Sequence, residues 1–412
     1  MSSTDRREFL HSAAGLAAAA AIVPSAAELE AVWRPRRAID VAVIGGGRQG
    51  RDILAELAKI EGVNVAAVCE LDKRRLRRAL RRTTGAKGYS EWNKMLAAHA
   101  GVTAVFVATP THLHKDVVIG LLRAGKHVYC EAPMASTIDD AKAIAKAGLS
   151  AKTTFQVGHY ARANPVYKLA RSFYRSGSIE TLISARCQWH RKTTWRLATS
   201  DASREKVLNW RLYQATSSGL PGEFGSHWFD AIRWFTRKTP VSVRGVGSTM
   251  LHNDGREIPD TVLCQFDFGE GVSMLFDATL ANSFGSRHAL LNGTMGTIKL
   301  AGRHGWLFKE ADAPVQGWEV YANRQQFHDE SGITLIADAT QLAAQGRLKD
   351  GVGLPHPELH YSLERFLQSA TEGKPVCCTA LDGLYAAAVS IKAHEAVLAN
   401  AEIKIDPSLF KV

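Results

Sequence analysis

Four apolar runs recur in the N-terminal part of the chain, and segments with helical spacing of apolar positions separate them. The runs lie at 38–44, 63–68, 103–108 and 126–130 and are made mainly of β-branched and other apolar residues. Short continuous apolar runs of this kind are typical of parallel strands that are buried on both faces. The pattern therefore predicts a doubly wound parallel sheet over about residues 38–154.

The hydrophobic pattern changes from about residue 155. Segments 261–268 and 272–278 alternate apolar and polar residues, with a Gly-Glu-Gly turn between them. Such alternation is typical of antiparallel strands with one face toward solvent. We therefore expect an α/β chain whose second part, residues 155–412, is an α+β domain.

The N-terminus has the pattern of an export signal. The pair Arg6-Arg7 is followed by Glu-Phe-Leu and by an alanine-rich apolar run at 13–23. This pattern resembles a twin-arginine signal, which the twin-arginine translocase reads to export folded proteins. We expect a signal peptide at 1–27, a linker at 28–37 and a periplasmic or extracytoplasmic location; an uncleaved anchor helix is the alternative.

Composition and charge exclude several classes of protein. The 412 residues are 46% hydrophobic and 22% charged, which argues against a disordered chain or a small disulfide-rich module. No apolar run in the body is long enough for an integral membrane domain. Much of the net charge of +11 lies in the basic run 73–82. Leucines four residues apart in this run favour a solvated helix over a nucleic-acid surface.

Cysteine and histidine spacing predicts no metal site. None of the six cysteines forms a C-x-x-C pair, and no histidine has the spacing of a zinc motif. Disulfides are neither required nor excluded.

A glycine-rich loop follows the first apolar run directly. The sequence Gly45-Gly46-Gly47-Arg48-Gln49-Gly50 fits G-x-G-x-x-G before a helical stretch. The first glycine permits the tight turn, the second a close approach of the pyrophosphate, and the third the packing of helix on strand. An acidic residue, Glu70, ends the next strand 20 residues beyond the loop, where it can hold ribose hydroxyls and repel a 2′-phosphate. We therefore expect a dinucleotide site that favours NAD over NADP.

Three later motifs make the resemblance to a family specific. The chain carries Thr109-Pro110 with His114 downstream, then a G-K-H-V-Y-C-E-A-P stretch ending at Pro133, then G-L-P-G-E-F-G-S-H-W-F-D at 219–230. In this order after the glycine loop, these motifs resemble the glucose–fructose oxidoreductase / inositol dehydrogenase (Gfo/Idh/MocA) family over about residues 38–400.

The resemblance implies both a fold and an activity. The family pairs a Rossmann domain with an α+β domain that has an open, mostly antiparallel sheet, and the catalytic cleft lies between the two. It further implies that helices at about 360–400 pack back on the first domain, and that the chain forms a homo-oligomer. The implied activity is NAD(P)-dependent oxidation of a sugar or polyol CH–OH group with a tightly bound cofactor. The residues expected to contact the cofactor are Gly45, Gly47, Arg48, Gln49, Gly50, Glu70, Thr109, Pro110, His114, Glu131 and Ala132.

The expected catalytic residues depart from the family pattern at two positions. His227 is the candidate base, since a neutral imidazole can take the hydroxyl proton. The family has an aspartate where this chain has Glu223, which in a helix could hydrogen-bond His227 from four residues before it. The family's E-K-P lysine is replaced by Ala132, so we expect Tyr160 or His159 to supply the missing acid or base. The residues expected to bind substrate are Arg162, Asn164, Trp210, Arg211 and Asp230.

Loss of the lysine leaves two other functions open. A branch of the family hydrolyses glycosides with bound NAD by transient oxidation at C3, elimination and return of the hydride, with no net redox change. A non-catalytic sugar-binding protein is the third possibility.

Overall fold

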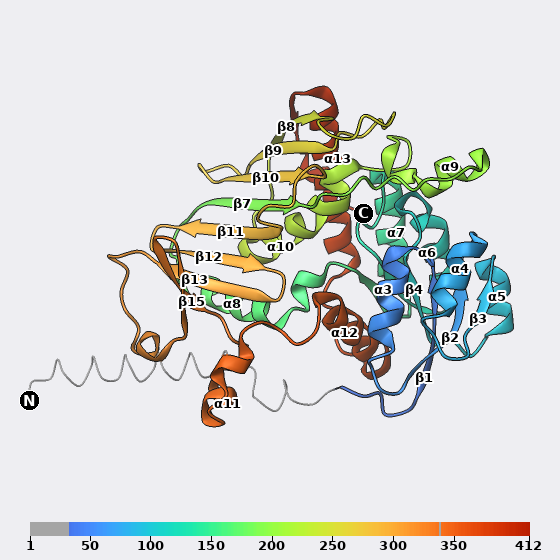
Figure 1. Cartoon of the computed structure of the whole chain (residues 1–412), viewed down its shortest axis with the longest axis horizontal. Helices are drawn as coiled ribbons and strands as arrows, with labels where there is room; N and C mark the ends of the chain where they lie inside the picture. The colour runs from blue at the N-terminus through green and yellow to red at the C-terminus, as the bar shows by residue number, and fades with distance from the viewer. Residues whose placement is uncertain (1–32, 338) are drawn as a thin grey trace, which may run out of the picture.

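The computed structural model describes residues 33–337 and 339–412. The expected signal peptide at 1–27, and the linker up to residue 32, lie outside these described residues. Two β-sheets and the helices around them make up the described chain (Figure 1).

The N-terminal sheet is parallel throughout. Its six strands lie in the order β3-β2-β1-β4-β5-β6, and every neighbouring pair is parallel. This is the strand order of the dinucleotide-binding fold, with the order reversing between β1 and β4. The strands are β1 (Ile39–Ile44), β2 (Val63–Cys69), β3 (Lys87–Tyr89), β4 (Ala104–Val107), β5 (His127–Cys130) and β6 (Phe155–Val157).

The second sheet is mixed and open. Its ten strands lie in the order β14-β15-β13-β12-β11-β7-β10-β9-β8-β16, and β7 with β10 is its parallel pair. Together with the first sheet, this confirms the predicted α/β fold class with a mostly antiparallel second sheet. The strands are β7 (Leu182–His190), β8 (Ser242–Ser248), β9 (Thr261–Asp267), β10 (Ser273–Thr279), β11 (Arg287–Gly293), β12 (Gly296–Ala301), β13 (His304–Lys309), β14 (Arg324–Phe327), β15 (Glu330–Thr334) and β16 (Glu402–Lys404).

Helices flank both sheets. Those preceding the second sheet are α3 (Arg48–Leu57), α4 (Lys73–Leu80), α5 (Trp92–Ala98), α6 (His114–Arg123), α7 (Ile138–Ser150) and α8 (Pro165–Arg175). The later ones are α9 (Ala202–Leu208), α10 (Ser226–Thr236), α11 (Ala339–Ala344), α12 (Glu358–Glu372) and α13 (Ala380–Ala399). No helix of the described residues is long and apolar enough to cross a membrane.

The two C-terminal helices connect the sheets. One side of α13 contributes Tyr385 and Val389 to the core of the second sheet, while Leu384 joins the core of the parallel sheet. Helix α12 contributes Leu363 and Phe366 to a third core, which covers the other face of β1 and packs against α3. Figure 1 shows α13 running between the sheets and α12 beside α3. These helices hold the glycine loop at a fixed place relative to the second sheet.

Candidate dinucleotide site and catalytic residues

The three glycines of the loop differ in what an added Cβ atom would meet. Gly45 has φ +103°, and a Cβ there would lie 2.3 Å from the Ala108 carbonyl oxygen. A Cβ on Gly50 would lie 1.7 Å from the Gly45 carbonyl oxygen, so helix and loop could not pack. Gly47, in contrast, faces open space with no atom within 4 Å. This opening is where the sequence predicts the pyrophosphate.

The first turn of α3 lies directly after that opening. Gly47 is its N-cap, no side chain caps it, and its first turn has no acidic residue. Uncapped N–H groups and the positive end of the helix dipole favour a bound anion. Arg48 is exposed and Gln49 half-buried in this turn. The residues present therefore fit a dinucleotide pyrophosphate.

Glu70 lies beside the loop at the end of β2. Its Oε2 accepts a hydrogen bond from the Gly46 amide at 2.8 Å, and its Oε1 accepts one from the Asp72 amide at 2.9 Å. The carboxylate is thus held next to the loop, in the place where a ribose would lie if the pyrophosphate lay over Gly47.

His114 joins two strand ends. Its Nε2 is 3.0 Å from the Thr109 carbonyl oxygen and its Nδ1 is 3.2 Å from the Met134 carbonyl oxygen. Burial lowers its pKa to about 4. Because both ring nitrogens face backbone carbonyls, His114 connects the segments that follow β4 and β5. Thr109, which follows β4, has a buried hydroxyl without a hydrogen-bond partner, while Pro110 caps the following turn.

A hydrogen-bonded chain links the E-A-P segment to Tyr160. The Gln49 amide donates to Glu131 Oε1 at 2.9 Å and to the Tyr160 hydroxyl oxygen at 3.3 Å. Glu131 is buried, and burial raises its pKa to about 8. Ala132 next to it is half-buried and brings only a methyl group. Gln49 therefore connects the Glu131 carboxyl group of the E-A-P segment to the Tyr160 hydroxyl group.

Glu131→Gln tests the raised pKa of this carboxyl through stability. The folded protein keeps the Glu131 proton up to about pH 8, whereas an ordinary Glu has a pKa of 4.5. The stability of the cofactor-free wild type should therefore fall as pH rises from 4.5 to about 8, a loss that glutamine cannot undergo. We expect the melting temperature of the variant, relative to wild type, to increase across this window. The exposed Glu330→Gln is the control; a constant difference for Glu131→Gln would contradict the raised pKa.

Two other predicted catalytic side chains, Tyr160 and His159, lie around His227. Its ring centroid lies 4.7 Å from that of Tyr160, 5.5 Å from that of His159 and 5.6 Å from that of Trp189. His227 Nδ1 and His159 Nε2 are buried without a hydrogen-bond partner. Burial, His159 and Arg287 together hold the pKa of His227 well below its usual range. The imidazole is therefore neutral, and its buried Nδ1 has no hydrogen-bond partner among the described residues.

The structure does not show the predicted hydrogen bond between Glu223 and His227. Residues Pro221–Gly225 form a π-helix before α10, which changes the rotation between positions 223 and 227. Glu223 Oε2 instead accepts a hydrogen bond from Arg211 Nε at 2.5 Å, and Oε1 accepts one from the Thr111 hydroxyl at 3.2 Å. Glu223 thus orients Arg211 and not the base.

Three residues predicted to bind substrate have structural partners. Arg162 forms a bidentate ion pair with Asp230 and a second ion pair with Asp382 on α13. The Asp230 side chain is fully buried, so its charge needs this arginine. Asn164 caps α8 and donates to the Gly302 carbonyl and to Glu358. These contacts hold structural elements together, and substrate binding by these three residues stays a prediction.

Trp210 and Arg211, which were both predicted to bind substrate, differ in their exposure. Trp210 is buried, whereas the Arg211 side chain is 41% exposed. The Arg211 guanidinium lies 4.3 Å from the Trp210 ring centroid and pairs with Glu223. Arg211 therefore remains a candidate for substrate contact, with Trp210 as its support.

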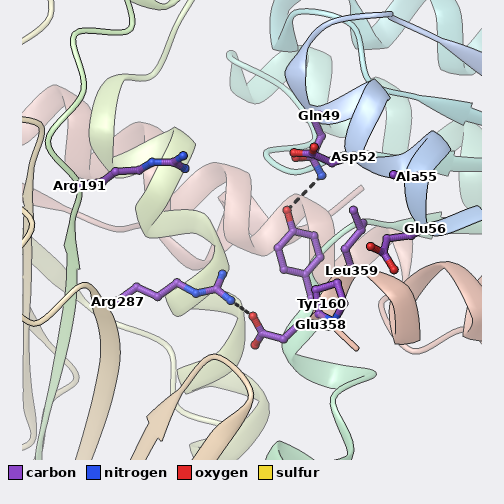
Figure 2. Close-up of a pocket in the computed structure, with 10 residues that line it drawn as sticks. Gln49, Asp52, Ala55, Glu56, Tyr160, Arg191, Arg287, Glu358 and Leu359 are labelled. Carbon is purple, nitrogen blue, oxygen red and sulfur yellow. Dashed lines mark hydrogen bonds and ion pairs between the residues drawn. The ribbon is translucent and has the colours of Figure 1, made fainter. Parts of the chain in front are cut away.

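A cavity of about 440 Å³ lies between α3, the start of α12 and the second sheet. Figure 2 shows Tyr160 in its middle, with Gln49 on one side and Arg287 and Arg191 across from α3. The full lining is Gln49, Asp52, Ala55, Glu56, Tyr160, Arg191, Arg287, Pro357, Glu358 and Leu359.

Sequence reasoning missed two residues of this region. Arg287 begins β11, pairs with Glu358 and lies 5.0 Å from the Trp189 ring centroid. Trp189 stacks on Phe224 with 4.7 Å between the ring centroids, and its ring also contacts His227. Neither belongs to a motif, because their proximity comes from the pairing of β11 with β7.

Comparison with known families agrees with this geometry. A sequence model described as "Oxidoreductase family, NAD-binding Rossmann fold" matches residues 39–159, and one described as "GFO/IDH/MocA C-terminal domain" matches residues 167–299. Together they cover more than half of the chain. The chain belongs to the Gfo/Idh/MocA family.

Curated relatives in this family carry several activities. Rhizopine catabolism protein MocA of Rhizobium meliloti is 27% identical over 69% of this chain and 83% of its own length. A 2,7-anhydro-N-acetylneuraminate hydratase of Escherichia coli is 27% identical over 48% of this chain and 51% of the relative. An inositol 2-dehydrogenase of Pseudarthrobacter chlorophenolicus is 29% identical over 56% of this chain and 64% of the relative. The last two matches span less than two thirds of those relatives.

Solved structures share the whole architecture. A levoglucosan dehydrogenase in complex with NADH superposes with a TM-score of 0.70 at 20% identity, over 89% of this chain and 99% of that chain. The likeness extends across both sheets. This Gfo/Idh/MocA protein is thus an oxidoreductase of a family that acts on sugars and polyols, with a Rossmann fold for NAD(H).

Proposed function

We propose that this chain oxidises a CH–OH group of a sugar or polyol, with His227 as the base, and holds NAD tightly. The observation that carries the proposal is the packing of His227 against Tyr160, 4.7 Å between ring centroids, beside the Gln49–Glu131 hydrogen bond. Through Tyr160 and Gln49, this arrangement connects the titratable His227 to Glu131 in the segment that follows β5. The family's lysine position, Ala132, offers no such group.

His227 takes the proton of the reacting hydroxyl in this proposal. Bound NAD⁺ supplies the hydride acceptor, so oxidation releases one proton and converts the carbinol to a carbonyl. A ring nitrogen of the neutral His227 accepts that proton in this proposal. Because burial, His159 and Arg287 disfavour the imidazolium, His227 would release this proton to water.

Tyr160 donates a hydrogen bond in place of the missing lysine. Its hydroxyl oxygen already accepts from Gln49, so its own proton remains free for a substrate oxygen. Burial and Glu131 raise the pKa of Tyr160, so it stays protonated. Tyr160 is thus a donor that stabilises charge on the reacting oxygen and not a second base. His159, which packs behind His227, keeps that ring in place.

NAD is favoured over NADP by Glu70. Its carboxylate is fixed by the Gly46 and Asp72 amides and would repel a 2′-phosphate. The opposing influence is the basic helix α4, whose Arg77 and Arg78 are exposed.

Redox-neutral cleavage of a glycoside is the second candidate. Two observations favour it: position 132 has no amine, and one relative is named a hydratase. In that reaction the same base and hydride transfer would form a C3 ketone, which acidifies the neighbouring C–H for elimination. Elimination would expel the aglycone, water would add to the resulting double bond, and the hydride would then return to the sugar.

One experiment separates these functions. The purified full chain is analysed by mass spectrometry for released dinucleotide and is then incubated in D₂O with polyols and glycosides. Net oxidation should accumulate NADH and a carbonyl product. Redox-neutral cleavage would release the aglycone, incorporate deuterium next to the oxidised carbon and leave the cofactor unchanged. A protein that neither releases dinucleotide nor binds added NADH would contradict both and favour a sugar-binding role.

A further inference from the structure

Two histidines and one glutamate meet at the edge of the cavity, away from His227. Glu56 lies in the last turn of α3, His360 in the first turn of α12, and His356 just before that helix. One ligand atom of each lies within 4.8 Å of the others. His360 Nδ1 is 3.2 Å from Glu56 Oε2, and the two imidazole rings stack with centroids 4.1 Å apart.

The donor set suits a divalent transition ion. Two imidazole nitrogens and one carboxylate oxygen form the ligand set of many zinc sites, with a fourth position for water. Zinc bonds of about 2.0–2.1 Å place adjacent tetrahedral ligands a little over 3 Å apart. The 3.2 Å separation of His360 Nδ1 and Glu56 Oε2 already matches that spacing. His356 is half-buried, and its ligand atom lies within 4.8 Å of those of Glu56 and His360.

The surroundings keep these ligands ready for an ion. His360 is buried and its Nδ1 faces the Glu56 carboxylate. The Glu56 side chain is only 10% exposed, which keeps competing water away. Lys59 holds Glu56 Oε1 at 2.6 Å, which leaves Oε2 to face His360. Glu56 also lines the cavity beside Leu359, which gives an ion a path of entry (Figure 2).

We propose that Glu56, His356 and His360 form a zinc-class metal site that clamps α3 to α12. In the sequence the two histidines are only four residues apart, but Glu56 lies 300 residues before His356, so only the fold brings the three together. The ion would fix the C-terminal end of the helix whose first turn faces the dinucleotide. Binding only to the folded chain, it would stabilise that chain by mass action.

Titration of the chelator-treated, tag-free full chain with Zn²⁺ and with Co²⁺ tests the site. We expect a single ion per chain, a rise in melting temperature with Zn²⁺, and a visible Co²⁺ spectrum typical of nitrogen and oxygen ligands. A sulfur-to-cobalt charge-transfer band would instead place the ion on the cysteines and overturn the proposal.

His356→Ala is the decisive variant because its side chain is half-buried and least needed for folding. We expect it to weaken Zn²⁺ binding by at least about tenfold, since even outer partners of metal ligands contribute that much. Glu56→Gln should weaken binding similarly, and the exposed His328→Ala should leave it unchanged. Unchanged affinity in His356→Ala, or no binding by the wild type, would overturn the proposal.

Discussion

His227→Ala should lower turnover by at least about 100-fold while the dinucleotide stays bound. General acid–base groups contribute about 10²–10⁴-fold, and no other side chain packed around His227 can take its place. Tyr160 and His159 are its neighbours, but Tyr160 stays protonated and His159 is fully buried. The loss should appear in kcat with substrate and cofactor saturating.

The pH profile distinguishes a base from a structural histidine. Because the pKa of His227 is held well below 6.5, wild-type activity should persist to pH values below 6.5 before it falls. Tyr160→Phe should cost less than His227→Ala, since it removes one hydrogen bond. The control is His288→Ala, which removes a half-buried histidine of β11. Wild-type turnover in His227→Ala would disprove its role as the base.

Gly47→Asp should abolish dinucleotide binding at concentrations that saturate the wild type. The site of the missing Cβ is open, so the aspartate folds in without a clash and fills the space of the pyrophosphate. Its carboxylate would also cap the uncapped first turn of α3 and neutralise the positive end that attracts phosphate. Calorimetric titration with NADH measures the loss.

Gly101→Asp is the matched control for that variant. Gly101 also has no atom within 4 Å of an added Cβ, and it lies in the turn before β4, outside the glycine loop. It should therefore bind NADH as the wild type does. Equal affinity of Gly47→Asp and Gly101→Asp would show that the pyrophosphate lies elsewhere.

The fold was predictable because its signals are local. Apolar runs such as that of β1 report burial on both faces, and alternation along β9 and β10 reports a sheet with one solvated face. The glycine loop is equally local, since Gly45 and Gly50 meet within one turn. The role of Gly50 follows from this local contact, whereas the Ala108 carbonyl that crowds Gly45 belongs to the segment after β4.

The contacts in the site that the sequence did not predict come mainly from long-range pairing. Arg162 and Asp230 are 68 residues apart in sequence, and only the fold places the buried carboxylate against the guanidinium. Asn164 was predicted to bind substrate, although an asparagine before a proline is also a helix cap, which is its role here. Glu223 does not contact His227 as expected, because the π-helix changes the rotation between the two positions. The spacing of residues in the sequence does not reveal a π-helix.

The groups that lie near Ala132 could be identified only from the three-dimensional structure. The sequence shows that the family's lysine is missing but not which group stands nearby. The structure places Tyr160 within hydrogen-bond distance of Gln49, which also binds the adjacent Glu131. This contact links positions more than a hundred residues apart, from Gln49 to Tyr160.

A crystal structure of the protein with NADH bound is the most direct measurement of the proposed site. We expect the pyrophosphate over Gly47 and the first turn of α3, and the ribose hydroxyls at Glu70. The nicotinamide ring should lie beside Ala132 and face His227, so that a hydroxyl between them comes within about 3 Å of a ring nitrogen of His227. A nicotinamide ring that lies out of reach of both His227 and Tyr160 would contradict the proposed chemistry.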